Sequence, residues 1–566
     1  MRRLLWNSKS ITLLSLLAIL FFQIAVGIYA IYLSRIFYSK YGPFFDSMAY
    51  FNGLAEMHAR AQSNGHLAAL IQRIYRSTVF YPWLAFAPFA SAVNLDRSIA
   101  TWIQVFASAA MQFAVFAYFL RGYRDRIVAL ASSTVFMGIA ALYWFDGGIA
   151  DFRMDLIQYF FYTAAMALYL IARSAKTRVR LRWTFFGIAV GILCLARATS
   201  PVYLVLVAAV LAPVDLFGAV GRRRELLEGW AVAAIAALSV AGWFYVMNWK
   251  FLHYYYFVWN SDANAKLPIT QSASHIAFAL SHVGNWLCAA LLLRAAVIVL
   301  AGLQQCGAQV LRRANWRPAW FSIAPIGYLV LSGAGLNPFV SIVSIAGLVM
   351  FLLEPLVPSP QPIRPPWEYL LATIIFAAMA VNFVGALDNY SREDRVSSWI
   401  PRRQGLDDLV RAMTDNVIAD RPREYRYAVA HIGSLSADVI FNTLAYDQKL
   451  PVKPNGAVVY GVVTLAKCYK GASTQVEWSA SEGATDDEKI DRLGNLLNSR
   501  CDFLAMADTS QLPPVAYINR FIPEIYRRTL LSGHWQAITG SLQISPTERI
   551  ILLKNRSRNT DVDINR

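Results

Sequence analysis

The chain has 566 residues, of which 57% are hydrophobic and only 15% are charged. Globular chains carry about 25% charged residues, so this composition excludes an ordinary soluble domain. Lys and Arg outnumber Asp and Glu by 52 to 35, which gives a formal net charge of +17. The basic residues lie in short loops between apolar runs, which indicates a membrane topology signal and argues against a nucleic-acid partner.

Long apolar runs between residues 11 and 387 predict a polytopic α-helical membrane protein, because one membrane-spanning helix needs about 20 apolar residues. The first run, at about 11–33, is longer than the apolar part of a signal peptide and is expected to be an uncleaved span. We expect about eleven spans in all. The others lie at about 99–120, 127–145, 156–172, 183–197, 201–218, 229–249 and 368–387, with one ending before 312–317 and two flanking 335–339.

Residues at about 47–95 are expected to form juxtamembrane helices instead of a further span. The aromatic piece at 79–95 is short for a span and contains Pro82 and Pro88. If this piece does not cross, every Arg-rich loop lies on the side of the N-terminus, as the positive-inside rule requires. If it did cross, most of those loops would move to the opposite side.

The composition changes after residue 387, where strand-like runs alternate with helical pieces. This pattern predicts a transmembrane domain at 1–387 and a soluble α/β domain at 388–566. With eleven spans, the second domain lies on the side opposite the N-terminus. It contains Cys468 and Cys501, for which a disulfide and two unrelated buried thiols are both open alternatives.

Carboxylates gather where two predicted spans meet the outer face. Asp46 follows the first span in the segment "FFDSMAYFN", and Asp151, Arg153 and Asp155 follow the third in "GGIADFRMD". Asp151 and Asp155 are four residues apart at the start of a predicted helix and should share one helical face. Helix capping explains each carboxylate alone. Two acidic clusters at one membrane boundary instead favour a functional site, because ionisable groups there are costly.

Arg197 ends the fifth span in "LARATSP", on the face where the positive-inside rule disfavours Arg. It is either an interfacial side chain that reaches toward water or the partner of a phosphate. The aromatic loop that begins at His253 is equally consistent with an interfacial belt and with a substrate-covering lid. The further candidates for substrate contact are Tyr81, Glu56, His253, Tyr255 and Lys266. No Cys or His spacing predicts a metal site, so the cofactor stays unknown, with a divalent cation as an open alternative.

These segments together resemble the GT-C glycosyltransferases. "FFDSMAYFN" is similar to their first outer loop, "YPWLAF" to the segment that follows it, "GGIADFRMD" to their second acidic loop and "LARATSP" to their Arg-containing turn. The resemblance is greatest to bacterial dolichyl-phosphate-mannose-mannosyltransferase-like enzymes, which include lipid A aminoarabinose and galacturonate transferases. It covers about 11–270 and, less clearly, continues to 387. "YPW" lacks the basic residue that precedes this element in the family, and "NPFV" at 337–340 departs from the family pattern.

The resemblance implies a membrane glycosyltransferase that moves a sugar from a polyprenyl-phosphate donor to a lipid, glycan or protein acceptor. It places the active site and the C-terminal domain on the periplasmic side of a bacterial inner membrane. Asp46 corresponds to the acid of the first loop, and either Asp151 or Asp155 to the acid of the second. Arg197 matches a position that faces donor phosphate. A base and a cation suffice for this chemistry, because phosphate is a good leaving group.

Two other classes of function are open from the sequence. A lipid or polysaccharide transporter or flippase should show repeated halves and charges near mid-bilayer, whereas the charges here lie at the outer ends of the spans. A non-catalytic envelope assembly protein with an outer binding domain is the second alternative. Membrane lipids are expected partners in all three cases.

Overall fold

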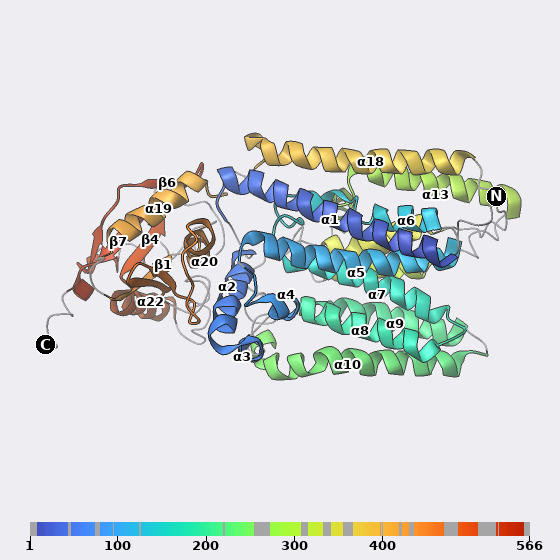
Figure 1. Cartoon of the computed structure of the whole chain (residues 1–566), viewed down its shortest axis with the longest axis horizontal. Helices are drawn as coiled ribbons and strands as arrows, with labels where there is room; N and C mark the ends of the chain where they lie inside the picture. The colour runs from blue at the N-terminus through green and yellow to red at the C-terminus, as the bar shows by residue number, and fades with distance from the viewer. Residues whose placement is uncertain are drawn as a thin grey trace.

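A computed structural model of the chain shows a bundle of helices joined to a mixed α/β domain (Figure 1). The N-terminus lies at the far end of the bundle, and the α/β domain covers the other end (Figure 1). The residues that the structure leaves undescribed are 1–7, 44–46, 74–79, 94, 124–125, 219–220, 254–271, 307–314, 332–340, 355–365, 397, 399, 418–421, 430–434, 469–484, 508–523, 525–527, 530 and 560–566.

Seven helices of the bundle are long and apolar enough to cross a membrane, and the chain is therefore a multi-pass membrane protein. These helices are α1 (Ser8–Lys40), α5 (Arg97–Tyr123), α7 (Met154–Arg173), α8 (Val179–Ala196), α9 (Ser200–Gly218), α10 (Arg223–His253) and α18 (Pro366–Ser391). Shorter helices of the bundle are α6 (Arg126–Val135), α12 (Ser272–Ser281), α13 (Asn285–Cys306), α15 (Arg317–Leu331) and α17 (Ile345–Leu353). The eleven predicted positions each contain a described helix, but only seven of these helices are long and apolar enough to be spans. α6 and α17, with 10 and 9 residues, are too short to cross a bilayer on their own.

Three short helices lie at the end of the bundle that faces the α/β domain: α2 (Ser47–Asn64), α3 (His66–Arg73) and α4 (Tyr81–Phe86). Figure 1 shows α2 running across the direction of the long helices. The predicted aromatic piece contains α4, of six residues, and the 3₁₀ turn Ala87–Phe89, which are both too short to span a bilayer.

Close backbone packing holds α8 against α10. A side chain at Gly187 would place its Cβ 2.3 Å from the carbonyl oxygen of Ala233, and one at Gly191 would meet Val240 at 2.5 Å. Small residues at four-residue spacing let membrane helices approach this closely. The contact fixes the height at which α8 ends, and so the place where Arg197 follows it.

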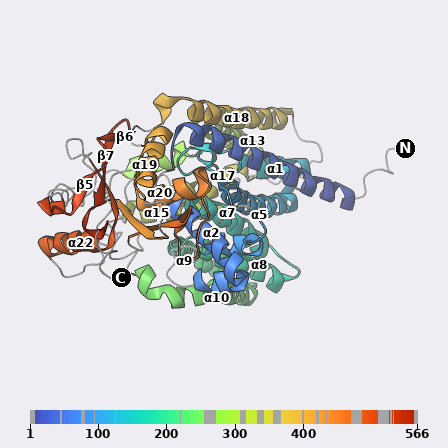
Figure 2. The same cartoon turned by 60° about the vertical axis from the view of Figure 1, so that its left-hand side comes forward.

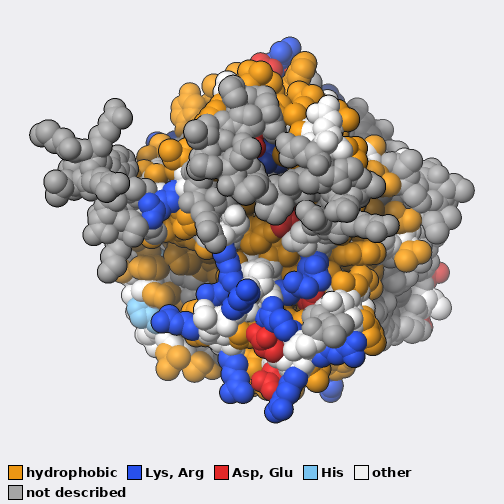
Figure 3. Space-filling view, turned by 90° about the vertical axis from the view of Figure 1, so that its right-hand side faces the viewer, with side chains coloured by type: hydrophobic (Ala, Val, Ile, Leu, Met, Phe, Trp, Pro, Cys, Tyr) orange, Lys and Arg blue, Asp and Glu red, His pale blue; other side chains and the backbone are white. Residues whose placement is uncertain are grey.

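Lys and Arg side chains gather on the end of the bundle that bears the N-terminus (Figure 3). The side chains of Arg180 and Arg224 are 81% and 94% exposed there. Just inside this surface, the buried carboxylate of Asp215 pairs with Arg173 at 2.7 Å and with Arg317 at 3.1 Å. The predicted gathering of basic loops at one end of the bundle is thus present.

The C-terminal domain is built on a seven-stranded sheet of order β2-β3-β1-β4-β7-β5, with β6 paired to β7. β1 runs parallel to both β3 and β4, and the remaining pairs are antiparallel. The strands are β1 (Glu424–Val429), β2 (Val458–Tyr460), β3 (Val463–Lys467), β4 (Phe503–Ala507), β5 (Trp535–Ala537), β6 (Leu542–Ser545) and β7 (Glu548–Asn555). The helices are α19 (Arg403–Asp415), α20 (Ala437–Asn442) and α22 (Asp486–Arg500).

The two faces of the sheet bury different side chains. Alternate residues of β4 point to opposite faces: Leu504 and Met506 pack with α22, whereas Phe503 and Ala505 join the cluster that includes α19 and α20. That second cluster continues without interruption into the helix bundle. Figure 2 shows α19 and α20 between the sheet and the bundle. The domain is therefore packed onto the bundle through a shared hydrophobic core.

Of the two alternatives for the cysteines, the structure has the disulfide. Cys468 follows β3 and Cys501 follows α22, and their sulfur atoms are 2.10 Å apart. The bond joins the residue that follows β3 to the segment just before β4.

Candidate active site

An ion pair joins α7 to α8 at the end of the bundle that bears α2. The Nη2 atom of Arg197 lies 3.2 Å from Oδ1 of Asp155, and the side chains are 19% and 6% exposed. The Nη1 atom of Arg197 donates a hydrogen bond of 3.1 Å to the hydroxyl of Tyr50, on α2. Arg197 therefore does not extend into water as a snorkelling side chain would. It connects three helices.

Local backbone geometry explains how these groups meet. Arg197 is the C-cap of α8 and has an extended backbone, with φ −149° and ψ 124°, which stops the helix. The chain then restarts at Ser200, whose hydroxyl accepts a hydrogen bond of 2.9 Å from Gln158 of α7. Asp155 lies in the first turn of α7, where the helix dipole favours a carboxylate. The turn between α8 and α9 is thus held over the first turns of α7.

The loop before α7 is closed by its own polar contacts. Arg153 pairs with Asp146 at 2.8 Å, and the backbone N–H of Gly147 donates to Oδ2 of Asp151 at 2.9 Å. The amide of Gln104, on α5, donates to the carbonyl oxygen of Asp151 at 2.9 Å. Asp151 and Arg153 are 2% and 4% exposed. The loop is therefore buried and anchored to a neighbouring helix.

The prediction that Asp151 and Asp155 share one helical face is wrong. α7 begins at Met154, and its N-cap, Arg153, has an extended backbone with φ −123° and ψ 140°. Asp151 therefore precedes the helix and does not cap it. The two carboxylates have different partners as a result: Asp155 meets Arg197, and Asp151 closes the loop that contains it.

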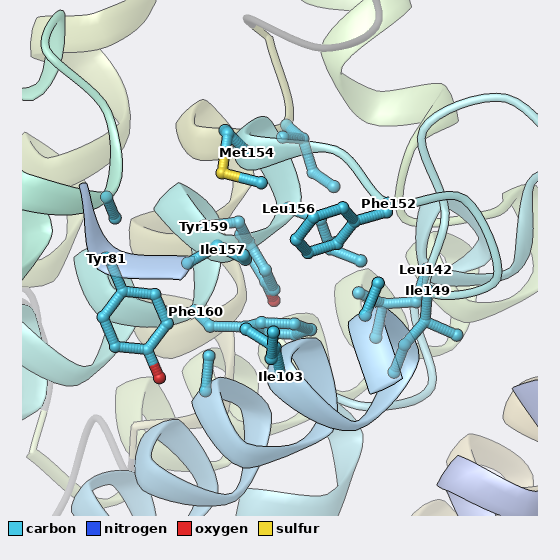
Figure 4. Close-up of a cluster of buried hydrophobic side chains, with 14 of the residues drawn as sticks. Tyr81, Ile103, Leu142, Ile149, Phe152, Met154, Leu156, Ile157, Tyr159 and Phe160 are labelled. Carbon is cyan, nitrogen blue, oxygen red and sulfur yellow. The ribbon is translucent and has the colours of Figure 1, made fainter. Parts of the chain in front are cut away.

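Phe152 fixes this loop against α2. Its ring centroid lies 5.1 Å from that of Phe51 and 6.4 Å from that of Tyr50. On its other side, Figure 4 shows Phe152 near a buried apolar cluster that includes Leu142 and Ile149. The acidic loop, α2 and the bundle core are thus one packed unit.

Comparison with solved structures identifies the arrangement of the whole chain. ArnT from Cupriavidus metallidurans in the apo state matches with a TM-score of 0.57 and 10% sequence identity, over 94% of this chain and 97% of that chain. The same protein bound to undecaprenyl phosphate matches with a TM-score of 0.54 and 11% identity, over the same shares of 94% and 97%. The chain has the GT-C fold. The resemblance inferred from the sequence motifs is therefore confirmed at the level of fold.

Other comparisons add less. An oligosaccharyltransferase from Archaeoglobus fulgidus, tethered to an acceptor peptide, matches with a TM-score of 0.49 and 12% identity, over 99% of this chain and 75% of that chain. That score is too low to support a structural conclusion. No model of a known protein family and no curated protein matches the sequence.

Within this GT-C fold, Tyr81 lies on α4 and is 6% exposed. Its ring packs edge-on against Phe161 at 4.7 Å, and its hydroxyl finds no hydrogen-bond partner among the described residues. Burial raises the pKa of Tyr81, so its hydroxyl stays protonated and can donate a hydrogen bond. Figure 4 shows the hydroxyl at the edge of the buried cluster.

Two other predicted residues lie apart from the Arg197 pair. Glu56 faces the C-terminal domain, where a side chain at Gly456 would come within 2.8 Å of its Oε1. His253 is the last residue of α10, is exposed, and has its ring 5.8 Å from that of Trp249. The structure therefore brings together Asp155 and Arg197, with Asp151 and Arg153 in the adjoining loop, and leaves these two outside that group.

Three predicted site residues, Asp46, Tyr255 and Lys266, lie outside the described residues. Among the residues that the structure does describe, no group of three or more His, Cys, Asp or Glu side chains is arranged to hold a metal ion.

Sequence reasoning missed Tyr50 and Asp146. Tyr50 follows Asp46 by four residues in the quoted segment, so the segment itself was found. Its partner Arg197 is 147 residues away, and no local pattern indicates that pairing. Asp146 stands directly before the two glycines of the acidic loop and was a recognisable candidate for Arg153.

A double-mutant cycle tests the specific pairing of Arg197. We expect Asp155→Asn and Arg197→Gln to be coupled by about 1–3 kcal/mol, because the two side chains are in direct contact. The matched cycle of Asp151→Asn with Arg197→Gln should show less than about 0.5 kcal/mol. Thermal unfolding in detergent measures both cycles. Equal coupling in the two cycles would contradict the assignment of Asp155 as the partner.

Proposed function

We propose that the chain is a glycosyltransferase that moves a sugar from a polyprenyl-phosphate donor to a lipid, glycan or protein acceptor. The observation that carries the proposal is the contact of Arg197 with Asp155 and Tyr50. It holds a guanidinium beside the helix that directly follows Asp46. The GT-C fold supports the same reading, since one matched structure of that fold is a complex with undecaprenyl phosphate.

The proposed reaction is a single displacement. Asp46 accepts the proton of the acceptor hydroxyl, whose oxygen forms a bond to the anomeric carbon of the sugar. The bond from that carbon to the phosphate oxygen breaks, and the polyprenyl phosphate leaves with the electron pair. Arg197 stabilises the charge that develops on the phosphate. Attack from the opposite face inverts the anomeric centre, as it does in inverting glycosidases.

The structure supports different roles for the two acids of the second loop. Asp155 directly contacts Arg197, so we assign it the task of orienting the guanidinium toward donor phosphate. Asp151 maintains the shape of the loop. The remaining predicted positions stay proposals for substrate contact. They are Arg153, Tyr81, Glu56, His253, Tyr255 and Lys266.

We propose that the site and the C-terminal domain face the periplasm of a bacterial cell, with the chain in the inner membrane. The supporting observation is the Lys- and Arg-rich surface at the opposite end of the bundle (Figure 3). Positively charged ends of membrane helices are retained on the cytoplasmic side.

Asp46→Asn should leave folding intact and abolish sugar transfer, because the amide retains the shape and the capping ability of the carboxylate but cannot act as a base. Release of undecaprenyl phosphate from undecaprenyl-phosphate-linked sugars of native membranes measures transfer. A transition temperature equal to that of the unmodified protein provides the control for folding. Normal transfer by a folded Asp46→Asn protein would reject the catalytic assignment.

Arg197→Ala should weaken binding of undecaprenyl phosphate by about tenfold or more, since a charge-assisted bond contributes about 1.5–3 kcal/mol. Arg197→Lys should recover part of the loss, because it restores the charge without the planar fork. The increase in transition temperature on addition of undecaprenyl phosphate measures binding. An unchanged increase in Arg197→Ala would exclude a phosphate contact.

The orientation of the chain can be tested in spheroplasts. A protease added from outside should cut residues 388–566 in intact spheroplasts, because eleven crossings place them outside. Peptide mapping under non-reducing conditions should recover Cys468 and Cys501 in one linked fragment. Protection of the tail until lysis would invert the proposed topology.

A further inference from the structure

A cluster of buried polar side chains connects α2 to the C-terminal domain. The amide of Asn52 donates a hydrogen bond to the carboxylate of Asp438, which also pairs with Nζ of Lys467 at 2.9 Å. The amide of Asn442 donates to Oδ1 of Asn52 at 3.4 Å. Asn52, Asp438 and Asn442 are 3%, 4% and 0% exposed. We call Asn52, Asp438 and Lys467 the α2 clamp.

An aromatic contact lies beside the clamp. Tyr446 of the C-terminal domain donates its hydroxyl hydrogen to the carbonyl oxygen of Phe51 at 2.6 Å, and the two rings are 5.6 Å apart. The other side of Phe51 packs on Phe152 of the acidic loop at 5.1 Å. Phe51 therefore lies between the C-terminal domain and the candidate site.

A second ionic contact holds the same segment of the domain to the first turn of α5. Arg97 pairs with Asp447 at 2.6 Å and donates to the side-chain oxygen of Asn442 at 2.7 Å. Arg403 also pairs with Asp447, at 3.0 Å. The short segment that contains α20 and the π-helical turn Thr443–Asp447 is thus fixed to two helices of the membrane domain, to α2 through Asn52 and to α5 through Arg97.

These contacts constrain the orientation of α2. Asn52 and Tyr50 are two residues apart, so they project from clearly different sides of the helix, about 100° per residue. Asn52 meets the C-terminal domain, and Tyr50 meets Arg197. Separating a buried ion pair or its hydrogen-bond partner destabilises the folded protein by several kcal/mol, because a charge is then left buried and unpaired. The clamp therefore resists rotation of α2. Rotation would displace Tyr50 from Arg197.

We propose that Asn52, Asp438 and Lys467 are positioning residues by which the C-terminal domain sets the register of α2 for sugar transfer. This inference rests on the proposed function, because Tyr50 and its partner Arg197 are the groups that the clamp positions. The alternative is that the clamp only attaches the domain to the bundle, in which case its loss lowers stability without a specific effect on turnover.

The first experiment measures α2 itself and does not depend on any activity. Asp438→Asn in the full-length protein should increase amide hydrogen exchange across residues 47–64, because the clamp no longer holds the helix. Asp502→Asn is the matched control. Asp502 is likewise a buried carboxylate of the C-terminal domain, 4% exposed in its side chain and paired with Arg423 at 2.8 Å. Its other charged neighbour, Arg558, also lies in that domain. Exchange in α2 unchanged by Asp438→Asn would overturn the proposal.

The second experiment measures turnover. Asp438→Asn should lower kcat for transfer by about tenfold or more, since small misplacements of reacting groups cost up to about 100-fold. The pH profile should keep its shape, because no acid or base is removed. Asp502→Asn should stay within about twofold of the unmodified protein if its loss affects only the C-terminal domain. Equal losses of kcat in the two variants would show attachment alone and overturn the inference.

Rescue and a second variant complete the test. The double variant Asn52→Asp with Asp438→Asn restores an amide facing a carboxylate and should recover part of the exchange protection and of kcat, because Lys467 still lacks its carboxylate partner. Lys467→Met, which removes only the ammonium group, should reproduce the Asp438→Asn effect and replaces that variant if Asp438→Asn protein fails to accumulate.

If the unmodified protein transfers no sugar, the proposed function fails, and increased exchange in α2 still identifies the clamp as a structural restraint.

Discussion

The pairing of Arg197 with Asp155 is the contact on which the geometry of this end of the bundle depends. Both groups lie at the ends of membrane helices, where a charge is costly unless it is paired. Their contact holds the end of α8 to the start of α7, and the hydroxyl of Tyr50 adds α2 to the pair. The position of Arg197 follows in turn from the glycine contact at Gly187, which sets α8 against α10.

The C-terminal domain completes this arrangement. The sheet face that packs on α19 and α20 belongs to the same hydrophobic cluster as the bundle, so the interface between the two parts has a continuous apolar core. From the domain, Tyr446 reaches Phe51, and Phe51 reaches Phe152 in the acidic loop. The candidate site, where α2, α7 and α8 meet, is thereby packed against the C-terminal domain as well as the bundle, which suits chemistry that requires accurate positioning of donor and acceptor.

Much of the architecture followed from local patterns in the sequence. Hydrophobic length indicated the positions of the helices, and the two prolines of 79–95 indicated that this piece stops short of a span. Alternating runs in the sequence located β1, β2, β3, β4 and β7 of the C-terminal sheet, whereas β5 and β6 were not predicted. The expected helix through Asp151 failed for a tertiary reason. Arg153 pairs with Asp146, and Gln104 binds the backbone of Asp151, so the chain stays in a turn-containing loop until the helix begins at Met154.

The sequence by itself determined which segments enter the membrane, which end carries the basic loops, and which segments bear the acidic and Arg-containing motifs. These properties depend on local composition and on the cost of transferring charge into lipid. Only the tertiary structure decided that Asp155, and not Asp151, meets Arg197, and that Asn52 meets Asp438. Those partners are tens to hundreds of residues apart, and only helix packing brings them within hydrogen-bond distance.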